Sequence, residues 1–128
     1  MSEKTITRHD LRKKAMTALY QHLLLGKDIK KILLENYGNA IDGFLYDITV
    51  DTVANKQRYI DAINQTLKKD WDFSRLGYLE QAILLMAVRE LDTQHTSKNI
   101  IINEAITLTK QYCDDESYKL INGVLDNL

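Results

Sequence analysis

The sequence predicts an all-α protein, and three observations support that prediction. Proline, the strongest helix breaker, is absent from all 128 residues, and glycine occurs only five times. Good helix formers are frequent, and no segment shows the sustained alternation of apolar and polar residues that marks a strand. We therefore expect a compact bundle of about six to seven helices with short connections, folded as a single domain over residues 1–128.

The first two helices are predicted by their apolar spacing and by the glycines that follow them. Apolar residues recur at helical intervals over residues 8–25, and Gly26 then stops the helix. A second helix is expected over residues 29–37, with Gly38 as its stop. The segment 40–47 is either a short helix or a loop, because Gly43 interrupts it.

A long helix is expected next, over residues 48–69, because its apolar residues can share one broad face. Trp71 and Phe73 then fall in a connection, where Ser74 is a candidate N-cap. The helix predicted over residues 76–91 is the most apolar of the chain. Apolar side chains surround most of it, so it should lie at the centre of the bundle.

The last quarter of the chain predicts two helices, over residues 99–112 and 115–126, joined by an acidic turn. The acidic residues of the turn are expected to cap the final helix and to complement its dipole. Gly123 suggests a close crossing between helices, because a missing side chain lets two backbones approach. The acidic residues in question are Asp114, Asp115 and Glu116.

Charge is distributed unevenly along the chain. The formal net charge is −1, but residues 1–14 hold five basic and two acidic side chains, a local +3, so the remainder carries −4. A basic N-terminal arm on a mildly acidic body suggests a polyanionic partner. The basic residues are Lys4, Arg8, Arg12, Lys13 and Lys14, and the acidic ones are Glu3 and Asp10.

Several kinds of chemistry are not expected. The single cysteine, Cys113, cannot form an intramolecular disulfide, which fits a reducing cytoplasm. No signal peptide is visible, and no apolar run approaches the ~20 residues needed to cross a bilayer. The chain has no glycine-rich phosphate loop, and its histidines lack metal-ligand spacing with Cys113. We therefore expect no enzyme, no catalytic residues, no cofactor and no metal. The histidines are His9, His22 and His95.

Three ordered motifs carry a resemblance to a known family. They are RHDLRKKAMTALYQ at residues 8–21, RLGYLEQAILLMAVREL at residues 75–91, and the final pair of helices with its Asn-Glu-Ala-Ile and Asn-Gly-Val-Leu-Asp runs. Each is moderately specific alone, because apolar helices look alike. Their order and spacing resemble the NusB family, bacterial antitermination factors that bind RNA, over nearly the whole chain.

The resemblance implies a function as well as a compact all-helical fold. Family members bind boxA-type single-stranded RNA in ribosomal leader transcripts. They do so with NusE, a small-subunit ribosomal protein, and the pair joins an antitermination complex on RNA polymerase. No enzymatic activity and no membrane association are implied. Some members form homodimers, and the sequence leaves that possibility open here.

Candidate RNA-binding residues lie at both ends of the chain. On a helix, Arg8 and Arg12 project from the same side with His9 and Lys13 beside them, a basic strip that phosphates favour. The alternative is a solvated face that only aids solubility. The resemblance adds three positions of the last helix. These positions are Ser117, Lys119 and Leu120. Leu120 stands where RNA-binding members can carry an aromatic residue. Ser117 is otherwise simply part of the first turn of the helix.

Two further residues match the family's protein-partner face. Tyr20 and Glu80 would contact NusE by resemblance, since tyrosine is a common interface anchor. Tyr20 is equally a half-buried core tyrosine, and Glu80 an exposed helix carboxylate.

The chain also departs from the family pattern. Leu85 stands where many members have arginine, Arg89 where they have tyrosine, and Thr52 where glycine is common, while the usual proline near Lys98 is missing and Asp10 interrupts the basic run. Asp10, Leu85 and Leu120 keep a second function open, a NusB-like protein-interaction module that has lost specific RNA readout. A targeting domain of an rRNA-modifying enzyme ranks last, because no catalytic domain is present in the sequence.

Overall fold

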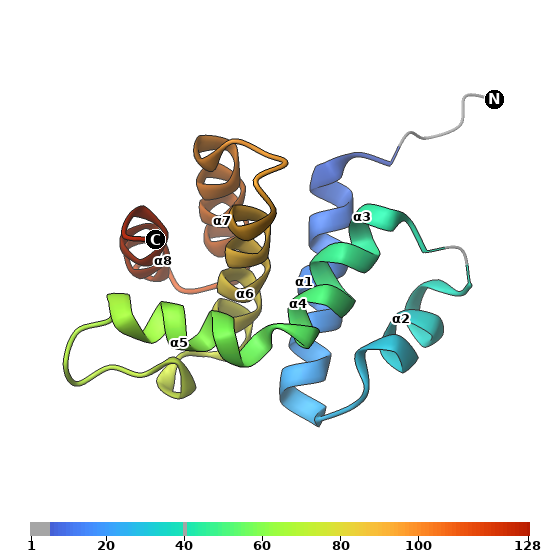
Figure 1. Cartoon of the computed structure of the whole chain (residues 1–128), viewed down its shortest axis with the longest axis horizontal. Coiled ribbons are helices and arrows are strands. Elements are labelled where there is room, and N and C mark those ends of the chain that lie inside the picture. Colours follow the sequence, from blue (N-terminus) through green and yellow to red (C-terminus); the bar gives the residue numbers. More distant parts are fainter. Residues whose placement is uncertain (1–5, 40) are drawn as a thin grey trace.

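The computed structural model describes residues 6–39 and 41–128, and every regular element among them is a helix (Figure 1). The N-terminal group comprises α1 (Arg8–Leu25), α2 (Ile29–Tyr37), α3 (Gly43–Tyr46), the π-helical turn η1 (Asp47–Asp51) and α4 (Thr52–Ala54). The C-terminal group comprises α5 (Lys56–Thr66), the 3-10 turn η2 (Phe73–Arg75), α6 (Tyr78–Thr93), α7 (Lys98–Tyr112) and α8 (Ser117–Asp126). Since α3, η1 and α4 run on as one helical segment, the described residues form seven helical bodies, which confirms the predicted bundle.

The core is built around α6, as predicted. Eight consecutive residues of this helix, 81–88, are buried, so apolar side chains leave it in every direction. It packs against α1 on one side and against α5, α7 and α8 on the other, and so joins the two groups (Figure 1). The site residues on the surrounding helices are therefore held by one common scaffold.

The bounds predicted for α1 and α2 are confirmed. Gly26 adopts a left-handed conformation, φ 66°, that suits glycine, and its N–H donates to the His22 carbonyl at 2.9 Å. The start of α1 explains why Asp10 interrupts the basic run. Thr7 Oγ1 accepts from the Asp10 N–H at 3.1 Å, and Asp10 Oδ2 accepts from the Thr7 N–H at 3.2 Å, a reciprocal cap.

The long helix predicted over residues 48–69 is wrong in its bounds. Helical structure begins earlier, at Gly43, and breaks at Asn55, whose side-chain amide donates to the Asp51 carbonyl at 2.8 Å. Asn55 itself leaves the helical conformation, with φ −110° and ψ 14°, and its side-chain amide shares the Asp51 carbonyl with its own backbone N–H, which donates at 3.2 Å. The next helix ends at Thr66, because Leu67 is extended. Ala40, which belongs to the ambiguous segment 40–47, lies outside the described residues.

Three predictions about the later connections are also wrong. Ser74 does not cap α6: it lies within η2, its N–H and hydroxyl both donate to Asp72, and Gly77 precedes α6. Glu116 occupies the N-cap position of α8 but makes no side-chain capping hydrogen bond, and its carboxylate pairs with Lys119. The predicted cap is therefore wrong, whereas the expectation that the acidic turn complements the helix dipole stays a prediction. Gly123 marks no close crossing, since a Cβ built there meets no atom within 4 Å.

Several departures from the family pattern are structurally satisfied. Arg89 of α6 binds Asp47 of η1, with Nη2 2.5 Å from Oδ1, and its Nη1 donates to the Tyr59 hydroxyl at 3.1 Å. Thr52 is fully buried and donates to the Ile48 carbonyl at 2.8 Å, while Leu85 is fully buried in the core. Lys98 donates to the Asp126 and Leu128 carbonyls at 3.3 and 2.9 Å, and so completes the end of α8.

Along residues 6–39 and 41–128, no helix is both long enough and apolar enough to span a bilayer. Within that same part of the chain, no group of three or more His, Cys, Asp or Glu side chains is arranged to hold a metal ion.

Candidate nucleic-acid interface

The first turns of α1 present part of the predicted basic strip. Arg8 is exposed, and its guanidinium carbon lies 4.0 Å from the centre of the Phe44 ring, on α3. A cation over an aromatic face is attracted by the ring quadrupole, which holds the guanidinium in one place without neutralising it. Arg8 therefore keeps its charge available at the surface. Lys4, predicted to extend the strip, lies outside the described residues.

Arg12 does not belong to the exposed strip, contrary to the sequence-based expectation. Its side chain is on the same side of α1 as Arg8, 5.4 Å from the Phe44 ring, but only 4% of the residue is exposed. Glu90 of α6 accepts two hydrogen bonds from it, at 2.9 Å from Nε and 2.8 Å from Nη2. This bidentate bond, ahead of the opposing effect of burial, raises the pKa of Arg12. Arg12 therefore fastens α1 to α6.

His9 and Lys13 have different surroundings. His9 Nδ1 lies 2.8 Å from Glu104 Oε2 of α7, with both side chains partly exposed. Glu104 also approaches Arg12, 4.0 Å from Nη1, so it joins the contact between α1 and α7. The ammonium of Lys13 has no hydrogen bond or ion pair with any described residue. Of the four predicted residues of α1, Arg8 and Lys13 thus keep a charge that no described carboxylate engages.

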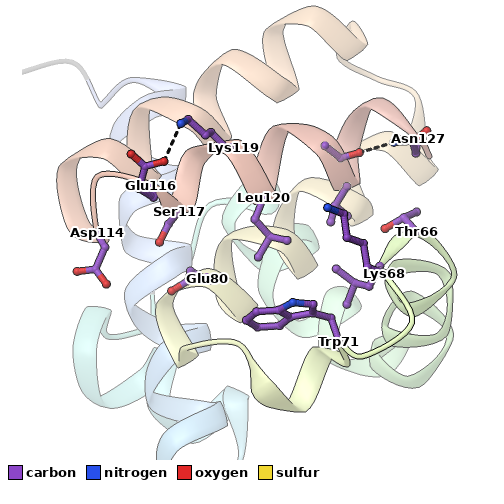
Figure 2. A pocket seen from close by; sticks show the side chains of 13 residues that line it. Thr66, Lys68, Trp71, Glu80, Asp114, Glu116, Ser117, Lys119, Leu120 and Asn127 are labelled. Carbon is purple, nitrogen blue, oxygen red and sulfur yellow. Dashed lines mark hydrogen bonds and ion pairs between the residues drawn. The ribbon is translucent and has the colours of Figure 1, made fainter.

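The predicted residues of α8 lie around a large cavity (Figure 2). This cavity, which we call the α8 cavity, has a volume of about 640 Å³ and lies between α8 and the segment 66–71. Ser117, Lys119 and Leu120 all line it. Lys119 Nζ is 2.7 Å from Glu116 Oε2, a surface pair that contributes little to stability but reduces the free charge at the rim.

A second, smaller hollow of about 290 Å³ brings the predicted partner residues together. Tyr20 from α1 and Glu80 from α6 line it, with Tyr78 and Tyr112 adding exposed aromatic surface. Desolvation, reinforced by the charge of Asp114, raises the pKa of Glu80. Glu80 also lines the α8 cavity, so the two hollows adjoin.

Sequence reasoning missed two classes of residue. The first comprises Trp71 and Lys68, which line the α8 cavity from a loop that the sequence identified only as a connection. The second comprises Glu90 and Glu104, the carboxylates that engage α1. Sequence spacing alone cannot distinguish an exposed tryptophan from a buried one. The Arg12–Glu90 pair could not be predicted either, because its two residues are 78 positions apart in the chain.

The chain is similar to known proteins over nearly its full length. The model of the NusB family matches residues 9–128. A relative named transcription antitermination protein NusB, from Bacillus cereus (strain B4264), is 38% identical over 125 residues, which cover 94% of this chain and 95% of the relative. The solved structure of T. maritima NusB is similar with a TM-score of 0.82 and 28% identity, covering 98% of this chain and 91% of that one.

A further likeness concerns fold alone. A chain in the crystal structure of antitermination factors NusB and NusE in complex with dsRNA superimposes with a TM-score of 0.78 at 24% identity, covering 94% of this chain and 93% of that one. The family match over almost the full length and the 38% identical relative settle the classification. The chain belongs to the NusB family.

Proposed function

We propose that this protein is a transcription antitermination factor. It binds boxA-type single-stranded RNA of ribosomal RNA leader transcripts together with NusE and joins an antitermination complex on RNA polymerase. Family membership over residues 9–128 and a curated NusB relative at 38% identity support this proposal. We assign it no enzymatic activity and place it in the bacterial cytoplasm, where transcription takes place.

The observation that carries the RNA-binding proposal is the cationic edge of α1. Arg8 is exposed and positioned by Phe44, and the Lys13 ammonium is free of any described carboxylate. Such groups can replace the counterions of a phosphate backbone. We extend the proposed RNA contact to His9 on the same helix and to the α8 residues Ser117, Lys119 and Leu120. Arg12 acts indirectly, by fixing the orientation of α1.

NusE is proposed to dock on the smaller hollow. Tyr20 and Glu80 meet there, and the neighbouring Tyr78 and Tyr112 are 44% and 42% exposed. Tyrosine is enriched at protein interfaces, where it offers a large contact area, and the partly desolvated Glu80 carboxylate offers a charge for a basic partner residue. Because this hollow adjoins the α8 cavity, a protein bound here would lie next to RNA bound there.

The proposal is tested by fluorescence anisotropy with a labelled boxA RNA and a scrambled RNA of the same composition, with and without NusE. Lys13→Glu should weaken binding and reduce the log–log salt slope, by about 0.7 for each phosphate that the variant no longer binds. Lys31→Glu is the matched control, since Lys31 is an exposed lysine on α2, outside the proposed RNA contact. Equal affinity of the wild type for both RNAs in every condition would refute sequence-specific binding.

A second function is favoured by one observation, the burial of Arg12. With this residue engaged by Glu90, the charge available on α1 is smaller than the sequence predicts. A NusB-like module that binds NusE but has lost specific RNA readout fits that arrangement. The same assay separates the two functions. Retained binding of NusE, with RNA affinity that is weak and equal for both sequences, would identify the module.

A further inference from the structure

The α8 cavity contains an aromatic face that the last helix itself lacks. Trp71 is 50% exposed, although its large ring would stabilise the core if it were buried. In Figure 2 the indole lies across the cavity from Leu120, which points down from α8 towards it. The two side chains thus form opposite walls, one aromatic and one aliphatic. An exposed ring opposite an apolar side chain offers a stacking surface to a planar guest.

The loop that carries Trp71 is held in place by its neighbours. The Trp71 N–H donates to the Lys68 carbonyl at 2.8 Å, and the next residue but one, Phe73, is buried. The Phe73 N–H in turn donates to Asn64 Oδ1 at 2.7 Å, which ties the loop to α5. An aromatic ring on a fixed loop loses little conformational entropy when a ligand stacks on it.

Charge is distributed across the cavity in two opposite regions. Lys68 reaches across the mouth on one side, and its ammonium has no partner among the described residues (Figure 2). Glu80, Asp114 and Glu116 lie towards the other side, where Lys119 pairs with Glu116 and leaves Glu80 and Asp114 as the carboxylates without a lysine partner among the described residues. A nucleotide matches this polarity, because it carries a negative phosphate at one end and hydrogen-bond donors of the base at the other.

We propose that the α8 cavity receives one unpaired base of the bound RNA, stacked on the indole of Trp71 and covered by Leu120. Lys68 binds the adjoining phosphate, and the carboxylates accept hydrogen bonds from the edge of the base. This inference rests on the proposed RNA binding and adds to it the residue that supplies the π-face. Trp71 is the only tryptophan of the chain, so its own emission reports on the cavity.

The first test uses the unaltered protein. Intrinsic fluorescence is recorded during titration with unlabelled boxA RNA, with scrambled RNA, and with NusE, each corrected for absorbance. Stacking of a base on the indole should quench the emission with the same midpoint as the anisotropy curve for boxA RNA. Binding of RNA that leaves the emission unchanged would overturn the inference.

The second test uses two variants that alter the cavity in different ways. Trp71→Leu keeps an apolar side chain but removes the π-face, and it should weaken boxA binding at least about fivefold, the lower limit for loss of one base stack. Trp71→Phe should retain most of the affinity. Gly123→Leu fills the cavity from α8, where a side chain has open space, and should weaken binding without touching Trp71.

Controls separate this inference from the proposed function. Leu34→Ala shortens an apolar side chain on α2 that is 53% exposed, and it should leave RNA binding unchanged. Thermal melts followed by circular dichroism establish that each variant is folded. If the wild type does not distinguish boxA from scrambled RNA, the proposed function fails, and this inference with it.

If the wild type distinguishes the two RNAs but Trp71→Leu and Gly123→Leu bind as it does, only the inference fails. If NusE alone quenches the emission and Trp71→Leu loses NusE rather than RNA, the cavity is a protein-docking site and the inference is overturned.

Discussion

Removing the charge of Glu90 should destabilise the protein strongly. Glu90→Gln keeps the size of the side chain but leaves the Arg12 cation at 4% exposure without its main counter-ion. Breaking a buried ion pair from one side costs about 3–5 kcal/mol, because the remaining charge stays desolvated. We expect a value near 3 kcal/mol, because Glu104, 4.0 Å from Arg12 Nη1, compensates in part.

The expected change in melting temperature follows from the size of the protein. An unfolding entropy of about 2.1 cal/mol/K per residue gives about 0.27 kcal/mol/K for this chain, so a loss of about 3 kcal/mol lowers Tm by about 11 °C. Replacing both partners, as in Arg12→Met with Glu90→Met, should return stability to within about 1 kcal/mol of the wild type, because no charge is then stranded. The comparison isolates the ionic pairing from the packing around it.

Urea unfolding followed by circular dichroism measures these free energies, with Arg12→Met, Glu90→Met and their double variant forming a cycle beside Glu90→Gln. Arg8→Met is the control, since among the residues that the structure describes this exposed arginine makes only a ring contact, and its loss should cost less than about 1 kcal/mol. A Glu90→Gln variant that loses less than about 1 kcal/mol would refute the reasoning. Arg12 would then be accessible to solvent, and it would again be a candidate RNA-binding residue of the basic strip.

Three further outcomes are expected. Burial raises the pKa of Glu80 above its ordinary value of 4.5. The ionised carboxylate therefore lowers the stability of the folded protein once the pH rises above 4.5. Glu80→Gln should raise Tm at pH 7 but not below pH 4.5. An equal gain at both pH values would contradict this. Burial also raises the pKa of Cys113 to about 11, which lowers the fraction of reactive thiolate. At pH 8, iodoacetamide should therefore react with Cys113 about a hundredfold more slowly than with a free thiol. A rate like that of glutathione would contradict this prediction. Arg89→Met should lose about 2 kcal/mol in urea unfolding, because Asp47 is left without its cationic hydrogen-bond donor while the Tyr59 hydroxyl keeps its bond to Asp92. An unchanged midpoint would count against that.

Local signals made much of the fold predictable from sequence. Gly26 and Gly38 end α1 and α2 where expected, because their cap conformations depend on glycine itself and little on distant contacts. The burial of α6 was predictable for a similar reason, since apolar side chains cover its whole circumference. The break at Asn55 was missed because apolar periodicity continues through it, whereas the break lies in the backbone angles of this one residue.

The site was less predictable than the fold, for a physical reason. A helical wheel places Arg8 and Arg12 on one side of α1, and the structure agrees. The wheel gives no information about which other helices pack against that side. Glu90 approaches Arg12 from another helix and changes it from a surface charge into an anchor. The chemistry of Leu120 was likewise judged within its own helix, whereas Trp71 faces it from a loop nearly 50 positions earlier in the chain.

The position of α6 has a consequence for the dynamics of the protein. Its amides over residues 81–88 are surrounded by α1, α5, α7, α8 and the segment of η1 and α4, so we expect them to exchange with solvent deuterium only when the whole bundle opens. Their exchange rates should therefore report the global free energy of unfolding. The amides of α2, which packs on one edge of α1 and on η1, should exchange through smaller openings. A ligand that binds the C-terminal group stabilises the folded state, so exchange in α6 should slow by the factor that corresponds to its full linkage free energy. Hydrogen exchange in α6 therefore measures ligand binding.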